Sequence, residues 1–291
     1  MKMNDTNIYR FRSYANMFGR SVFSTFVEEQ NMTYISSKIN KYDKECNFTF
    51  REYYTYIYKI LLSNYRNEYI YKNLIINKIL LGKHSLNTST ILNEFRIGKS
   101  IADLVFLNGT SKVFEIKTEL DNLSRFNSQV NDYRKVFKQI YIVTHVSLAD
   151  KFSQTIGDNV GIIVLTKNKT LKIVREALED MTFFDPVAMF KCLRKVEYTN
   201  VINSFYGEIP QVKAVNYYSV CKELFIKIPL EELHSLMLKE LKKRCVKEKE
   251  LFASVVPEEL KLLFWNLNYG KKEYEKFTQI IDKNVLEFNT K

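Results

Sequence analysis

A largely apolar stretch in the middle of the chain contains the charged residues Asp103, Glu115 and Lys117. On a β-strand, residues two positions apart point to the same face, so Glu115 and Lys117 would lie side by side. By itself, Glu-x-Lys on a strand is more often a weak ion pair on a solvated sheet surface. A second carboxylate on the neighbouring strand changes the chemistry, because oxygen ligands on one face suit a hard cation such as Mg²⁺.

The loop between the two strands decides whether Asp103 faces Glu115. A two-residue turn at Asn108-Gly109 would place the two carboxylates on opposite faces of the sheet. A loop one residue longer pairs Leu107 with Ser111 and sets Asp103 directly opposite Glu115. Only this longer loop leaves the opposite face apolar, with the residues Ala102, Leu104, Phe114 and Ile116. Opposed carboxylates repel each other unless a cation lies between them, so the sequence predicts half of a Mg²⁺ (or Mn²⁺) site.

The surrounding sequence predicts the elements that would position these residues. A helix begins at Asn64 or Asn67 and ends at Gly82, and three strands follow, separated by Gly98 and by Asn108-Gly109. The pattern continues with a helix, a strand, a helix and two strands, over residues 123–137, 139–146, 148–157, 160–168 and 170–178. This order predicts an α/β fold whose single central mixed β-sheet is flanked by helices on both faces.

Composition changes along the chain suggest three segments. All four prolines follow residue 185, which places a boundary near residues 180–186. We expect an N-terminal, mainly helical segment over residues 1–63, an α/β core over 64–182 and a C-terminal helical region over 183–291.

The pattern of Asp103, eleven intervening residues and then Glu115-Ile116-Lys117 resembles the core signature of the PD-(D/E)xK nuclease superfamily. The predicted order of elements over roughly residues 64–150 is similar to that superfamily's restriction-endonuclease-like core. Ala102 stands where the signature has a proline. Gln129 and Tyr133, one helical turn apart, resemble the QxxxY motif of RecB-like members. The segment Leu193-Arg194-Lys195-Val196-Glu197-Tyr198 is similar to one found in a little-characterised bacterial branch.

The resemblance implies roles for these residues in a metal-dependent hydrolysis of phosphodiester bonds. Asp103 and Glu115 would bind Mg²⁺, with the main-chain carbonyl of Ile116 as a further ligand. Lys117 would position the attacking water and the phosphate, and Gln129 and Tyr133 would support that arrangement.

A further carboxylate ligand has two candidates. The resemblance implies one from the helix before the first strand, where Glu68 stands near the helix start. Glu94 is the rival, because a tight turn at Gly98-Lys99 would set it opposite Asp103.

The charge of the chain suits a polyanionic partner. Its formal net charge is +11 and its pI about 9.2, which favours DNA through neutralisation of phosphates. The alternative is a nucleic-acid-binding or protein-binding subunit that keeps the nuclease fold but is inactive without a protein partner.

The cysteine content and the distribution of apolar residues indicate the cellular location of the protein. The four cysteines form no C-x-x-C pair, and we see neither a secretory signal nor a membrane-spanning run. We therefore expect a cytoplasmic protein with no membrane partner. The family resemblance suggests a bacterial role in phage defence or mobile-element biology.

Overall fold

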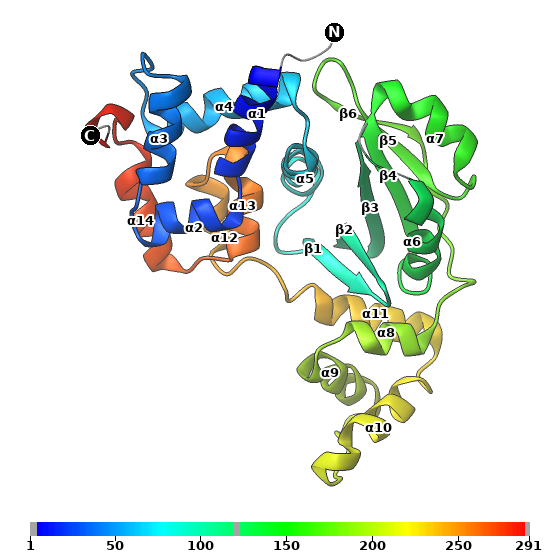
Figure 1. The fold of residues 1–291 in the computed structure, drawn as a ribbon. Coiled ribbons are helices and arrows are strands. Elements are labelled where there is room, and N and C mark those ends of the chain that lie inside the picture. The colour runs from blue at the N-terminus through cyan, green and yellow to red at the C-terminus, as the bar shows by residue number, and fades with distance from the viewer. Residues whose placement is uncertain (1–4, 119–120, 122, 289–291) are drawn as a thin grey trace. The chain divides into compact units, whose positions relative to one another are not determined.

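The chain forms two compact units. The computed structural model describes residues 5–118, 121 and 123–288 (Figure 1). One unit combines the two ends of the chain, Met1–Ile79 and Val246–Lys291, and the other is Leu80–Cys245. The sequence boundaries near residues 63 and 182 follow changes in composition, whereas these units group residues by their contacts. The predicted C-terminal helical region is thus shared between the two units.

The unit built from the two chain ends is helical. Helix α4 begins with a capping box, in which Thr49 accepts a hydrogen bond from the backbone N–H of Glu52. Phe23 and Phe264, from the two ends of the chain, pack edge to face with ring centroids 5.7 Å apart. The elements are α1 (Asp5–Met17), α2 (Arg20–Glu28), α3 (Thr33–Tyr42), α4 (Phe50–Asn64), α5 (Glu68–Ile75), α12 (Lys249–Ser254), η4 (Glu258–Leu260), α13 (Lys261–Leu267), α14 (Lys271–Ile281) and η5 (Val285–Phe288), while the π-helix η1 (Ile76–Leu81) leads into the other unit.

The second unit contains a six-stranded mixed sheet, as the sequence predicts. The strands lie in sequence order, β3, β4 and β5 are parallel, and the other neighbours are antiparallel. The strands are β1 (Thr90–Ile97), β2 (Ser100–Asn108), β3 (Thr110–Lys117), β4 (Gln139–His145), β5 (Gly161–Leu165) and β6 (Leu171–Arg175). The helices between them are η2 (Leu123–Arg125), α6 (Phe126–Tyr133), η3 (Val146–Leu148) and α7 (Ala149–Thr155). The predicted order of helices and strands is confirmed.

The hairpin between β2 and β3 has the longer loop. Leu107 pairs with Ser111, and Val105 with Val113, as the apolar pattern predicts. Ala102, expected on the opposite face, instead belongs to the same core cluster as Val105 and Val113. The pairing of β1 with β2 is interrupted just before Ala102, where Glu94 has a φ of 52°, and this irregularity breaks the strict alternation of faces.

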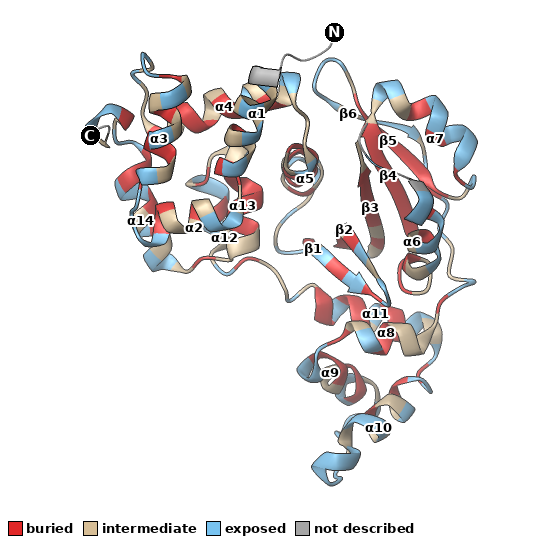
Figure 2. Ribbon diagram, in the orientation of Figure 1, coloured by how far each residue is buried: buried red, intermediate tan, exposed pale blue. Residues whose placement is uncertain are grey.

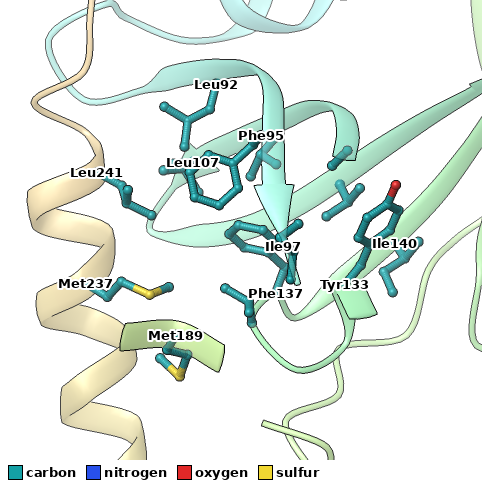
Figure 3. Packing of buried hydrophobic residues seen from close by; sticks show 14 of the residues in the cluster. Leu92, Phe95, Ile97, Leu107, Tyr133, Phe137, Ile140, Met189, Met237 and Leu241 are labelled. Atoms are coloured by element: carbon teal, nitrogen blue, oxygen red, sulfur yellow. The ribbon is translucent and has the colours of Figure 1, made fainter. Parts of the chain in front are cut away.

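Four more helices extend the core beyond the sheet. They are α8 (Pro186–Cys192), α9 (Lys195–Tyr206), α10 (Ala214–Phe225) and α11 (Leu230–Leu241). Met189 of α8 and Met237 of α11 belong to the same buried cluster as Phe95 and Phe137 (Figure 3). The sheet is buried along β4 and β5, whereas α10 is largely exposed (Figure 2).

One residue of the segment 193–198 has a clear structural task. The carboxylate of Glu197 accepts hydrogen bonds from Arg244 Nε at 2.6 Å and from the backbone N–H of Arg194 at 2.7 Å. Glu197 therefore caps the start of α9 and ties that helix to the residues that follow α11.

The helices of the described residues are all too short or too polar to cross a bilayer.

Candidate active site

Strand β3 presents Glu115 and Lys117 on the face that carries the core residue Val113. Glu115 is only 2% exposed. The Nζ atom of Lys117 lies 2.8 Å from Oε1 of Glu115, so the ammonium group neutralises a carboxylate that would be costly to bury alone. Thr144 of β4 donates a hydrogen bond to the main-chain oxygen of Lys117, which fixes the end of β3.

Helix α6 brings Gln129 and Tyr133 to the same carboxylate. Gln129 Nε2 donates to Glu115 Oε1 at 2.7 Å, and its own Oε1 accepts from Lys117 Nζ at 3.3 Å. The hydroxyl of Tyr133 lies 2.8 Å from Glu115 Oε2 and 2.9 Å from the carbonyl oxygen of Ile101. Four residues that the sequence analysis selects from two distant motifs thus form one hydrogen-bonded network.

Tyr133 remains a neutral donor in this network. Burial first, and then the negative charges of Glu115 and Asp103, raise the pKa of its hydroxyl well above the usual value.

Asp103 comes opposite Glu115 where β2 and β3 separate. The regular pairing of these strands ends at Leu104 and Phe114, one position before the two acidic residues. Oδ2 of Asp103 then accepts a hydrogen bond from the backbone N–H of Ile116 at 2.7 Å. The side chain of Asp103 thereby takes over a backbone donor of β3 at the residue that follows Glu115.

A clamp from α6 holds the beginning of β2. Ser100 Oγ donates to Asp132 Oδ2 at 2.8 Å, next to the contact between Tyr133 and Ile101. The sequence analysis missed Asp132, and only its position beside Tyr133 could have drawn attention to it. Gly98, with a φ of 58°, makes the preceding turn tight enough for this contact.

The two candidates for a further carboxylate lie in different units. The turn at Gly98-Lys99 is tight, since Ile97 pairs with Ser100, and the register sets Glu94 opposite Asp103. Glu94 is exposed. Glu68 belongs to the other unit, where its carboxylate pairs with Lys72 at 2.5 Å. In the described part of the chain, no three His, Cys, Asp or Glu side chains are grouped so that they could share one metal ion. A ligand role for either residue stays a prediction.

The residues present fit a magnesium ion that keeps most of its water. Mg²⁺ usually binds proteins through one or two carboxylates and retains several water ligands. Asp103 and Glu115 supply two such carboxylates from facing strands, and the carbonyl of Ile116, between Glu115 and Lys117, remains the predicted third oxygen. Lys117 Nζ and Gln129 Nε2 bond Oε1 of Glu115, and the hydroxyl of Tyr133 bonds Oε2.

Comparisons with known proteins point to a phage protein family. The family model described as bacteriophage P4 protein cII matches residues 62–263, more than half of the chain. Protein cII of Enterobacteria phage P4 is 29% identical over 93 residues, a match that covers 31% of this chain and 35% of the phage protein. The chain therefore spans about a third of that relative's length. A solved structure of a protein of unknown function from Silicibacter pomeroyi matches 32% of this chain and 63% of its own, with 15% identity and a TM-score of 0.27.

Proposed function

The chain belongs to the family of bacteriophage P4 protein cII, and for this member we propose a metal-dependent nuclease that hydrolyses phosphodiester bonds of DNA. Its second unit would be a restriction-endonuclease-like core of the PD-(D/E)xK type. The observation that carries the proposal is the buried network of Glu115, Lys117, Gln129 and Tyr133, with Asp103 on the facing strand.

The network suits a reaction that needs fixed charges. Glu115 is held by donors from Lys117, Gln129 and Tyr133, so its orientation is set before a substrate arrives. A buried polar network in which every member has a partner is rigid as well as strong. Such preorganisation is what an electrostatically catalysed hydrolysis requires.

Each side chain would have a distinct task. Asp103 and Glu115 would hold the Mg²⁺ or Mn²⁺ ion, which when bound lowers the pKa of water and offsets charge on the phosphate. Lys117 would move its ammonium group toward a phosphate oxygen and orient the attacking water. Gln129 and Tyr133 would keep the carboxylate of Glu115 in place while Lys117 shifts.

The charge and the setting accord with this proposal. A net charge of +11 favours a phosphate backbone, and we propose DNA as the partner. The four cysteines are free thiols, which suits the cytoplasm. We place the activity in phage or mobile-element biology, including phage defence, because the family is described by a bacteriophage protein.

A second candidate function is a DNA-binding or protein-binding subunit that does not cut alone. Both oxygens of Glu115 are already engaged by donors of the same chain. In this alternative, a protein partner would break the hydrogen bonds to Glu115 or supply a further ligand for the metal ion.

The deciding experiment compares the wild type with Asp103→Asn. Purified protein is incubated with plasmid, linear duplex and single-stranded DNA in Mg²⁺ or Mn²⁺, with EDTA as a control. Asparagine can still accept the hydrogen bond from Ile116, so the variant should fold and bind DNA yet lose cleavage. Cleavage that persists in EDTA or in the variant would contradict the proposal. Salt-dependent binding without any cleavage by the wild type would favour the subunit.

A further inference from the structure

Helix α6 has a second face that the candidate active site does not use. A pocket of about 360 Å³ lies between this helix and the turn that precedes β5. Four polar side chains line it, from Asn127, Asn131, Arg134 and Asn159, together with three apolar ones, from Phe126, Val130 and Val160. Its volume falls within the usual range of small-molecule sites, which begins at roughly 300 Å³.

The helical repeat separates this pocket from the active-site network. Each residue advances the helix by about 100°, so positions 127, 131 and 134 form one narrow stripe. Gln129 and Tyr133 fall on the opposite side, where they contact Glu115. A ligand bound to these three side chains would therefore lie on the side of the helix away from Gln129 and Tyr133, whereas Phe126, at the apolar end of the pocket, lies only about 20° from Tyr133 around the helix.

Arg134 supplies a positive charge at the pocket. Its guanidinium group contacts an aromatic ring, but its Nε forms no hydrogen bond among the described residues. Its guanidinium carbon lies over the ring of Phe183, 4.8 Å from the ring centroid, which is a cation–π contact. Its Nε is buried and has no hydrogen-bond partner among the described residues. A buried donor without a partner is unfavourable, and an incoming anionic oxygen would satisfy it.

The carboxylate of Asp180, on which the charge of Arg134 acts, bonds a different donor. The pKa of Asp180 is lowered mainly by hydrogen bonds from Thr182, and in part by the positive charge of Arg134. The carboxylate accepts the backbone N–H of Thr182 at 2.8 Å. Arg134 thus keeps donor capacity for a ligand.

The opposite wall of the pocket is braced from β6. Arg175 Nε donates to the carbonyl of Val160 at 2.8 Å, and Arg175 Nη2 donates to the carbonyl of Gly157 at 3.1 Å. The turn that carries Asn159 is therefore held in shape before any ligand binds. A preformed wall lowers the entropic cost of binding.

We propose that this pocket binds one nucleotide, with its phosphate on Arg134 and its base among the three asparagines. Amide groups offer both donors and acceptors, as the edges of nucleobases require. Phe126 and Val130 supply apolar surface for the sugar or the base. The inference rests on the proposed nuclease function and adds a second place where a nucleotide would bind. The nucleotide is either free or one unit of the DNA strand near the cleavage site.

The test measures binding without metal, so that it is independent of cleavage. Wild-type protein in EDTA is titrated with deoxyadenosine monophosphate and, separately, with a short single-stranded oligonucleotide, using calorimetry and NMR. Arg134→Gln should weaken binding by about tenfold or more, because a hydrogen bond to a charged group is lost. Asn131→Phe should weaken it similarly by filling the pocket from an exposed position, which keeps the fold intact.

Matched variants separate the outcomes. Lys151→Gln removes an exposed positive charge from α7 and should leave the affinity unchanged. Binding of the mononucleotide would identify a free ligand, and binding of the oligonucleotide alone would identify a strand subsite. An absence of saturable binding to either probe, or binding that Asn131→Phe does not alter, would overturn the inference. Loss of cleavage in Asp103→Asn with nucleotide binding retained would bear on the active site alone.

Discussion

The ammonium group of Lys117 lies 2.8 Å from a carboxylate oxygen of Glu115, two residues earlier on the same strand. The two side chains are 11% and 3% exposed. A pair so shielded from water interacts more strongly than a surface ion pair, and removal of one partner leaves a charge that water cannot solvate. The pair therefore links the stability of the sheet to the proposed chemistry.

Replacing Lys117 with methionine should reduce DNA cleavage by on the order of 10²-fold or more, because a contact to the transition-state charge is lost. DNA affinity should change little, since one phosphate contact alters the slope of its salt dependence by about one unit. Lys112→Met is the matched control, because Lys112 stands on the same strand with its Nζ over the ring of Tyr141. Equal cleavage by both variants would exclude a catalytic role for Lys117.

Replacing Tyr133 with phenylalanine should lower both stability and cleavage. The hydroxyl is the donor to Glu115 Oε2, and its loss should reduce the free energy of unfolding by about 1–3 kcal/mol. Tyr141→Phe is the control. The hydroxyl of Tyr141 donates to Glu176 at 2.6 Å and takes no part in the network around Glu115. Urea denaturation and a plasmid cleavage assay would separate the two effects. A normal rate in Tyr133→Phe would show that Glu115 needs no donor from α6.

Stability should depend on the protonation of His234. This residue is 4% exposed and lies 3.1 Å from the hydroxyl of Ser111. Burial first, and then the charge of Lys138, lowers the pKa of the imidazole from 6.5 to about 4. Between these two values the unfolded chain binds the proton and the folded chain does not, so stability falls as the pH drops through that range.

The full effect would be about 3 kcal/mol, since each pKa unit corresponds to roughly 1.4 kcal/mol. Urea denaturation of the wild type and His234→Gln between pH 4 and 7 would measure it, and the variant should show a flatter profile. Equal slopes for the two proteins would show that His234 is protonated alike in the folded and unfolded chains.

Gly161→Ala should destabilise the sheet by about 1–3 kcal/mol through overpacking. A Cβ at this position would lie 2.7 Å from the backbone nitrogen of Ala177 and closer still to the ring of Tyr141. Gly157→Ala is the control, because its Cβ would meet only the end of the Asn159 side chain. Thermal unfolding of both variants would test this, and equal melting temperatures would argue against the close approach at Gly161.

Local patterns were enough to predict the strands and their register. The alternation of apolar residues around Asn108 and Gly109 admits one clean pairing, because a slip of one residue would reverse every face. The same pattern selects Glu115 and Lys117. The spacing of Gln129 and Tyr133 selects the two residues of α6 that bond Glu115.

Contacts set by tertiary structure could not be read in this way. The hydrogen bond from Ile116 to Asp103 and the clamp of Asp132 on Ser100 depend on where two strands separate. The face of Ala102 depends on the backbone at Glu94, a non-glycine residue with positive φ that composition does not reveal. The grouping of the chain ends into one unit likewise depends on contacts between residues more than 200 positions apart, such as Phe23 and Phe264.

The first unit joins both ends of the chain, and this has a consequence for synthesis on the ribosome. The backbone N–H of Phe50 bonds the carbonyl of Lys283, and that of Val285 bonds the carbonyl of Phe48. Because the chain emerges from its N-terminus, the early helices must wait for residues near 283 before these bonds form. The sheet unit, Leu80–Cys245, is synthesised completely before residue 283, so it can fold before these bonds of the first unit form.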